Sequence, residues 1–459
     1  MKRKIKKYTI RFLLFSLLIP FGCTNNSKSN QSKKIENVVQ KTTINVIGHW
    51  LHEGKREDLV RNFAREYEFE HQNIAVNLKF PEEIFFDKLD RASSEKFVAK
   101  VVLEEHPEWD VIKINGAYDE IKNILKDPDW PRKYLVDFSQ IEEFRNGTRP
   151  ELLTDEAKKT FNGIIPGPFV EGQFWALWCN NKVAEKVGIK VKQFGMTVED
   201  FIGYLKAINT YNKNHPTQYI IPIYESYVWT TALAIGIQMY ASLLSGPEEF
   251  NSATITEHRL NAWAKTLEAV ELMSQYKPLN PKWRTTEWTK TQGMLINEEC
   301  LFYVNGSWMY NIWLAIDAKK TLNCMPAEFP SFGEFSVYPG TSIITWAVLK
   351  NAPHREEAIK YLLAMNKPEM ADMWVRYTKC PTGIKGSLAD VTFGGDQFEN
   401  FSFNVQNKYK NKQYKYYESG HWVLNNSITQ GSALYFTEVI EGKMTAKEAM
   451  KKIRKSVGK

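Results

Sequence analysis

Residues 43–80, TINVIGHWLHEGKREDLVRNFAREYEFEHQNIAVNLKF, contain two kinds of hydrophobic spacing. Both ends, residues 43–48 and 74–80, alternate and are rich in β-branched side chains, which predicts two strands. Between them, residues 54–71 carry apolar side chains three and four positions apart, which predicts an amphipathic helix. A second helical stretch at 83–104 precedes a third predicted strand at 109–116. This alternation predicts βαβ units, and therefore an α/β fold with mainly parallel sheets and helices on both faces.

Polar and aromatic residues stand at the ends of these predicted strands. Trp50 and Glu53 follow the first strand, and Asn115 lies at the end of the third. In parallel α/β sheets, ligands bind beyond the carboxyl ends of the strands. We therefore expect Trp50 to stack on a ligand, and Glu53 and Asn115 to accept or donate hydrogen bonds to it.

The pattern continues through the rest of the chain. Further strands are predicted at 174–180, 219–224, 301–304 and 342–349, and helices at 229–244, at 257–276 and from residue 354 onward. Two capping boxes, at residues 197–200 and 445–448, predict helix starts, because each places a threonine three residues before an acidic side chain. The chain has no internal repeat.

The first 41 residues have the features of an export signal. A basic stretch at 1–7 leads into a short apolar run at 12–19, a Gly22-Cys23 pair and a polar stretch at 24–34. The apolar run is shorter than the roughly 20 residues that span a bilayer. We expect a signal peptide at 1–22, a lipidated Cys23 with a flexible tether to residue 41, and an exported protein anchored at the periplasmic or cell-surface side of the membrane. Because Pro20 stands where lipoprotein signals usually have leucine, a plain cleaved signal and an uncleaved anchor stay open.

The composition narrows the class of protein. The formal net charge is +7, but residues 1–41 carry ten Lys/Arg and one Glu, which leaves the remaining chain near −2. A folded body without basic excess argues against a nucleic-acid partner. The cysteines beyond Cys23 form no CxxC pair, which argues against a metal or redox centre, and no cofactor is expected. Disulfides and buried thiols both stay open for Cys179, Cys300, Cys324 and Cys380.

Four segments, in order, resemble the family 1 extracellular solute-binding proteins of ABC importers, the group that includes maltose-binding protein. WCNNKVAEKVGI at 178–189 is similar to the family's YYNKDLFEKAGI stretch, and FYVNGSW at 302–308 to its M-x-I-N-G-S-W segment. WAVLKNA at 346–352 begins the strand and helix that carry KNSKNKEAAWKFL in the family, and EGKMTAKEA at 441–449 resembles its GKMTPEEAL helix. The chain departs from the pattern at Cys179, where the family usually has tyrosine.

The resemblance implies two lobes joined by several crossings, with a ligand cleft between them and hinge closure around the ligand. The expected boundaries are 42–172 and 338–378 for the first lobe, and 173–337 and 379–459 for the second. The family often stacks a sugar on the aromatic residue at Trp308, and Trp422 resembles another cleft aromatic. Trp229, at a predicted helix start, and Tyr338, before a predicted crossing, are further candidates, whereas Trp346 and Trp374 are expected in the core.

The chemistry of these candidates favours a carbohydrate. A sugar presents apolar C–H faces and a ring of hydroxyl groups, and flat aromatic rings with a few polar side chains satisfy both. Several tryptophans suit an oligosaccharide, bound by a monomer that delivers it to an ABC permease. A peptide, a polyamine and an organic anion are alternative ligands, and a surface lipoprotein that binds a glycan or host without transport is an alternative role. A secreted glycoside hydrolase is disfavoured. Such an enzyme needs a pair of carboxylates, but the mere abundance of acidic residues is no evidence for a catalytic pair, and common hydrolase motifs are missing from the sequence.

Overall fold

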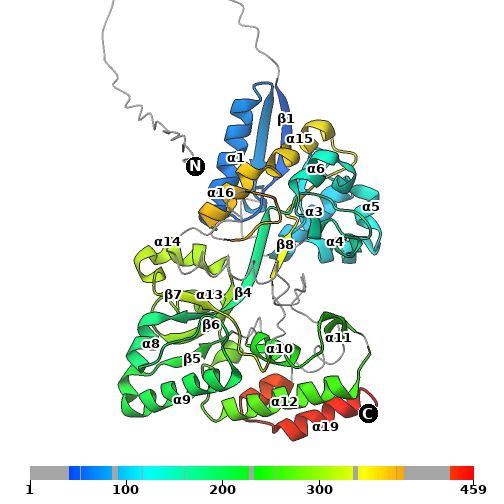
Figure 1. Cartoon of the computed structure of the whole chain (residues 1–459). Helices are drawn as coiled ribbons and strands as arrows, with labels where there is room; N and C mark the ends of the chain where they lie inside the picture. The colour runs from blue at the N-terminus through cyan, green and yellow to red at the C-terminus, as the bar shows by residue number, and fades with distance from the viewer. Residues whose placement is uncertain are drawn as a thin grey trace, which may run out of the picture. The chain divides into compact units, whose positions relative to one another are not determined.

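The computed structural model describes residues 41–51, 53–84, 91–115, 117–159, 161–226, 232–252, 254–333, 340–378, 380–386 and 435–459. Figure 1 shows their arrangement. The predicted signal peptide, Cys23 and the tether up to residue 40 lie outside the described residues, as do Trp229, Tyr338 and Trp422.

The first sheet contains the strands predicted from residues 43–116, together with one strand from late in the chain. Its order is β2-β1-β3-β9, formed by β1 (Thr42–Ile47), β2 (Ile74–Lys79), β3 (Val111–Lys113) and β9 (Trp346–Val348). β1 runs parallel to β2 and β3, and β9 runs antiparallel to β3. The helix α1 (Lys55–Glu70) connects β1 to β2 and buries the apolar stripe that the sequence indicated, Leu59, Val60, Phe63, Ala64 and Tyr67.

The second sheet is mixed, whereas the sequence predicted mainly parallel pairing. Its order is β5-β6-β4-β7, formed by β4 (Glu171–Asn180), β5 (Ile221–Tyr224), β6 (Cys300–Gly306) and β7 (Cys324–Ala327). β5 and β6 are parallel, but β4 runs antiparallel to β6 and β7. β4 enters from the end of the first core and not through a crossover helix from a neighbouring strand, so the constraint that makes βαβ strands parallel does not apply to it.

The predicted strand at 342–349 is two strands in the structure. β8 (Gly340–Ile343) pairs with the first half of β4, whereas β9 pairs with β3 in the first sheet. Between them, the carbonyl oxygen of Thr345 accepts a hydrogen bond from the amide of Ile114 at 2.8 Å. A continuous run of strand-forming residues therefore serves two sheets, and only the change of partner reveals the division.

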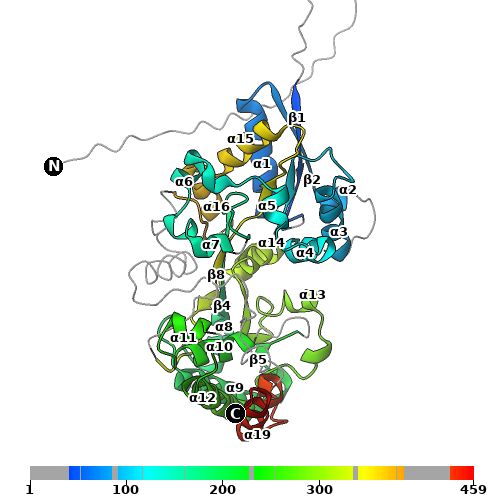
Figure 2. The ribbon, with the colours of Figure 1, turned by 90° about the vertical axis from the view of Figure 1, so that its right-hand side faces the viewer.

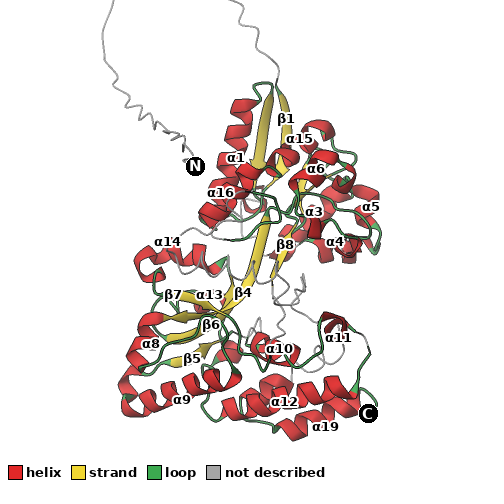
Figure 3. Cartoon of the chain, viewed as in Figure 1, coloured by secondary structure: helices red, strands yellow, loops and turns green. Residues whose placement is uncertain are grey.

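Helices cover both sheets (Figures 2 and 3). With the first sheet lie α2 (Pro81–Ile84), α3 (Arg91–Val102), α4 (Tyr118–Leu125), α5 (Trp130–Tyr134), α6 (Glu142–Gly147), α7 (Asp155–Lys159), α15 (Arg355–Met365) and α16 (Pro368–Thr378). With the second lie α8 (Asn181–Val187), α9 (Val198–Asn214), α10 (Leu233–Ala241), α11 (Pro247–Asn251), α12 (Glu257–Ser274), α13 (Trp288–Thr291), α14 (Met309–Thr321) and α19 (Ala446–Ser456). Short 3-10 helices occupy Phe138–Gln140, Pro150–Leu152, Pro216–Gln218 and Trp283–Thr285.

Both predicted capping boxes are confirmed. At the start of α9, the Thr197 hydroxyl accepts the amide of Asp200 at 3.1 Å, and the Asp200 carboxylate accepts the amide of Thr197 at 3.0 Å. Thr445 and Glu448 make the same reciprocal pair at the start of α19. Each box satisfies two backbone donors that a helix start leaves without partners.

The hydrophobic side chains form one cluster around the first sheet and two on the second. Trp346 and Trp374 are fully buried in the first cluster, which confirms their predicted core role. Among the described residues, the four cysteines that follow the tether are buried free thiols.

Candidate functional site

Trp50 lies three residues beyond β1, but its ring is in the core. It packs 5.2 Å from the Trp346 ring and 5.1 Å from the Trp374 ring, and only 3% of the residue is exposed. Its backbone has a φ of 75°, which is uncommon for a residue other than glycine and is held here by this packing. The sequence correctly predicted that Trp50 comes just after the first strand, but it did not indicate that the ring turns inward. In this conformation the indole has almost no surface with which to stack on a solute.

Arg56, in the first turn of α1, is the centre of a buried charge cluster that the sequence analysis missed. Its Nη1 lies 2.9 Å from Oε1 of Glu171 and 3.2 Å from Oε2 of Glu53. The guanidinium carbon also lies 5.5 Å and 5.7 Å from the centres of the Trp50 and Trp374 rings, within the range of cation–π attraction. Burial alone lowers the pKa of Arg56, but the carboxylates of Glu171 and Glu53, together with the nearby Cys380 side chain, raise the pKa above its usual value. Arg56 is therefore a permanent cation inside the first core.

Glu171, the first residue of β4, is the buried carboxylate of this cluster. Only 2% of the residue is exposed, and its Oε2 accepts a hydrogen bond from Nδ2 of Asn115 at 2.8 Å. Burial raises the pKa of Glu171 to about 7, since the stabilising effects of Arg56 and Asn115 are partly opposed by the charge of Glu53. Asn115, a predicted ligand-binding residue, therefore holds Glu171 with its amide group. Glu53 differs from Glu171, because 37% of its side chain is exposed to solvent.

Trp308, the predicted sugar-stacking residue, follows the carboxyl end of β6 at the start of α14. Its ring is half-buried and meets the Trp175 ring edge-on, with 5.1 Å between ring centres and an interplanar angle of 90°. A Cβ atom on Gly306 would lie 2.0 Å from the Trp308 ring, so the ring position requires glycine there. The neighbouring Ser307 amide donates to the carbonyl of Phe174 at 2.7 Å. These contacts fix Trp308 beside β4 while leaving part of its surface free.

β4 brings the charge cluster and the aromatic pair onto one strand. Glu171 and Trp175 are four positions apart, and side chains at even spacing share one face of a strand, about 13 Å apart at this separation. Polar groups of Glu53 and Asn115 therefore lie toward one end of this strand face, and Trp308 toward the other. Trp50 and Glu53 lie beside Arg56, Asn115 joins them through Glu171, and Trp308 is separate from this cluster.

Buried polar groups with hydrogen-bond partners lie at and near the carboxyl end of the second sheet. Glu225 follows β5 directly, is 1% exposed, and accepts the amides of Ser226 at 2.8 Å and Ala232 at 2.6 Å. The hydroxyl groups of Tyr303 and Thr291 are 2.8 Å apart. β5 and β6 are parallel, so their carboxyl ends lie at the same edge of the sheet, where Trp308 follows β6.

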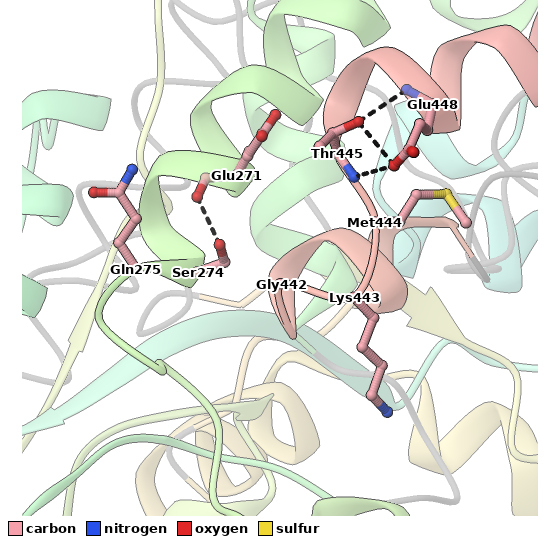
Figure 4. A pocket seen from close by; sticks show the side chains of 8 residues that line it. All are labelled: Glu271, Ser274, Gln275, Gly442, Lys443, Met444, Thr445 and Glu448. Atoms are coloured by element: carbon pink, nitrogen blue, oxygen red, sulfur yellow. Dashed lines mark hydrogen bonds between the residues drawn. The ribbon is translucent and has the colours of Figure 1, made fainter.

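A shallow pocket of about 240 Å³ lies where the end of α12 meets the start of α19 (Figure 4). It is lined by Glu271, Ser274, Gln275, Gly442, Lys443, Met444, Thr445 and Glu448, and includes none of the predicted site residues. Its carboxylates already have partners: Glu271 accepts the amide of Ala446 at 2.8 Å, and Glu448 belongs to the capping box. The pocket is also smaller than typical small-molecule sites of about 300–1,000 Å³.

In the described part of the chain, no three His, Cys, Asp or Glu side chains are grouped so that they could hold a metal ion. Nor does any helix in those segments combine the length and apolar character needed to cross a bilayer.

A family model and a curated relative that match this chain both belong to solute-binding proteins. The family of bacterial extracellular solute-binding proteins matches residues 88–400. The melibiose/raffinose/stachyose-binding protein MelE of Bacillus subtilis (strain 168) is 20% identical over 397 residues, which cover 85% of this chain and 84% of MelE.

Two solved structures share the fold. The GacH receptor of Streptomyces glaucescens, solved without ligand and with acarbose, superimposes with a TM-score of 0.61 at 12% identity, covering 91% of this chain and 97% of GacH. A sugar transporter protein of Bacillus licheniformis in complex with stachyose gives 0.56 at 15% identity, covering 90% and 99%. Because the sequence identities are low, these structures establish the two-lobe fold of solute-binding proteins and nothing beyond the fold.

Proposed function

Because the chain belongs to the family of bacterial extracellular solute-binding proteins, we propose that it captures a carbohydrate, and specifically an oligosaccharide, for an ABC permease. The observation that carries the proposal is Trp308. Its half-buried ring is fixed against Trp175 and lies at the carboxyl edge of the second sheet. A rigid, partly open indole provides the flat apolar surface on which a sugar ring stacks.

The polar part of the proposed site is Glu53, supported by Asn115. The Glu53 carboxylate is partly exposed and already accepts a charge-assisted hydrogen bond from Arg56, which leaves lone pairs for sugar hydroxyl groups. Trp229, Tyr338 and Trp422 complete the proposed aromatic set. The burial of Trp50 supports an indirect role for that residue, as packing beneath Arg56.

The relatives support this class of ligand. MelE is named for binding melibiose, raffinose and stachyose, and the Bacillus licheniformis protein was solved with stachyose. The proposed site lies between lobes with the boundaries 42–172 with 338–378, and 173–337 with 379–459. We propose that the protein is a monomer, with the lipid on Cys23 and the tether holding it at the outer face of the membrane.

A thermal-shift screen tests the ligand class. The chain from residue 24 onward is mixed with raffinose, stachyose, maltose and monosaccharides, with amino acids, peptides and polyamines as controls. A ligand at about 100 times its dissociation constant stabilises the fold by roughly 2.7 kcal/mol, which raises the melting temperature by several degrees. A shift with one saccharide series supports the proposal. A shift with a control solute alone would reject the carbohydrate and leave the binding-protein family intact.

A further inference from the structure

Arg56 joins an exposed carboxylate to a buried one. The same atom, Nη1, lies 3.2 Å from Glu53 and 2.9 Å from Glu171. Exposure of the two glutamate side chains differs, at 37% for Glu53 and 3% for Glu171. Because one nitrogen serves both carboxylates, the position and charge of the buried group affect how firmly the exposed group is held.

The buried end of this bridge is fixed to paired backbone. Glu171 is in register with Ile343 of β8, and the next amide, of Gly172, donates to the carbonyl of Pro381 at 2.7 Å. A Cβ atom on Gly172 would lie 2.4 Å from that carbonyl oxygen, so the two segments are as close as backbone allows. Nη2 of Arg56 reaches the same segment, 3.6 Å from the Cys380 sulfur. Two chain segments, β8 and residues 380–381, therefore hold Glu171 and Arg56 in place.

We propose that Arg56 is a positioning residue for solute binding, which holds the Glu53 carboxylate toward the solute and is itself fixed by Glu171. This inference rests on the proposed function, because it takes Glu53 as a group that contacts the solute. The specificity for solutes that carry hydroxyl groups then depends on the cluster of Glu53, Arg56 and Glu171 and not on Glu53 alone.

The protonation state of Glu171 should make solute affinity depend on pH. The groups that face it are Arg56 from α1, Glu53 from the loop after β1, and Asn115 after β3, while Cys380 faces Arg56. The pKa of Glu171 is raised to about 7 by burial. Protonation neutralises one of the two carboxylates that compete for Nη1 and removes the repulsion of Glu53, while the uncharged carboxyl group keeps an oxygen that accepts from Arg56. Arg56 then holds Glu53 more firmly. Solute affinity should therefore be higher below this pKa than above it.

A variant cycle tests the proposal by calorimetric titration of raffinose and stachyose at pH 6 and pH 8. We expect the wild type to bind about fivefold more tightly at pH 6, and Glu171→Gln to bind at the tighter level at both values. Glu53→Gln and Arg56→Lys should each weaken binding about tenfold. The double variant Glu53→Gln/Arg56→Lys should bind no more weakly than Glu53→Gln alone, because Arg56 acts through Glu53. Additive losses, or a wild-type pH profile in Glu171→Gln, would overturn the positioning role.

Tryptophan fluorescence supplies a readout that needs no solute. The rings of Trp50 and Trp374 lie beside Arg56, so wild-type emission should change around pH 7 and Glu171→Gln should not show the change. His49, 5.1 Å from the Trp50 ring, belongs to a residue type that titrates in this range, and His49→Gln is the control that should keep the change.

The two assays separate failure of the inference from failure of the proposed function. A wild type without the fluorescence change would overturn the charge coupling. A clear change with neither saccharide bound would exclude raffinose and stachyose as solutes and leave the charge coupling intact. The same cycle run with the solute from the thermal-shift screen would then decide the positioning role.

Discussion

Glu171 and Trp175 share one face of β4, but the side chains at the two ends of this face are held in different ways. At the Glu171 end, a buried cation and two carboxylates compensate one another. At the Trp175 end, Trp308 is fixed by ring contact, by Gly306 and by backbone hydrogen bonds between neutral groups. Removing one member of a charge cluster leaves a buried charge without its partner, whereas removing one aromatic ring costs only the packing contacts of that ring. The first region should therefore respond strongly to charge and pH, and the second to shape.

The largest expected effect comes from breaking the cluster at its cation. Arg56→Met leaves Glu171 buried without its ion partner and should lower the free energy of unfolding by about 3–5 kcal/mol. Arg61→Met is the matched control on the same helix, because Arg61 pairs with Glu57 and Glu83 near the surface and should cost at most about 1 kcal/mol. Urea unfolding of both variants makes the comparison. Equal losses would mean that the buried pair has no special role.

Glu171 should give the stability a pH dependence that the Trp308 region lacks. Its pKa is raised from 4.5 to about 7, so between these values the folded state holds a proton that the unfolded state has released. Stability should then fall as pH rises through this interval, by up to about 1.4 kcal/mol per pH unit. Urea unfolding at several pH values checks this, with Glu171→Gln as the variant that should lose this contribution. An unchanged slope in Glu171→Gln would assign the dependence to other groups.

Trp308→Ala probes the aromatic end. Loss of the stacking surface should weaken saccharide binding by about 1–2 kcal/mol, with a pH dependence of affinity like that of the wild type. Trp175→Phe is a useful companion, because it retains an aromatic ring beneath Trp308 and should have the smaller effect. Calorimetry on a saccharide from the screen measures both. Undiminished affinity in Trp308→Ala would remove this residue from the site.

The smallest effect is expected from a helix cap that belongs to neither end. Thr197→Ala removes the hydroxyl that accepts the Asp200 amide and should cost about 1 kcal/mol of stability without changing solute affinity. Thr197→Ser retains the hydroxyl and should restore most of the loss. A drop in affinity in Thr197→Ala would show that the start of α9 influences the site.

Local signals made most of the fold predictable. The spacing in residues 54–71 identified α1, and the two capping boxes located α9 and α19, because each depends on neighbours within a few residues. The division of residues 342–349 between β8 and β9 was not predictable, since both halves have the same strand-forming composition and differ only in their partners.

The candidate site was predictable in part for the same reason. Glu53 and Arg56 are three residues apart, a spacing that allows an ion pair, but Glu171 is distant in sequence and no local pattern connects it to them. The inward direction of the Trp50 ring depends on Trp346 and Trp374, which come from the far end of the chain. The place of Trp308 just after β6 was predictable, because the strand predicted at 301–304 runs directly into Asn305-Gly306-Ser307-Trp308, whereas its role in binding stays a prediction.

The buried thiols have a consequence for a protein of an extracellular family. Thiol–disulfide exchange requires thiolate, and burial raises the pKa of Cys179 to about 12 and those of Cys300 and Cys324 well above the usual value. These three thiols lie in adjacent strands of the second sheet, whereas Cys380 belongs to the first core. In the folded chain these three thiols should thus react slowly in thiol–disulfide exchange, and the rate at which they are alkylated should report how often the core of the second sheet opens.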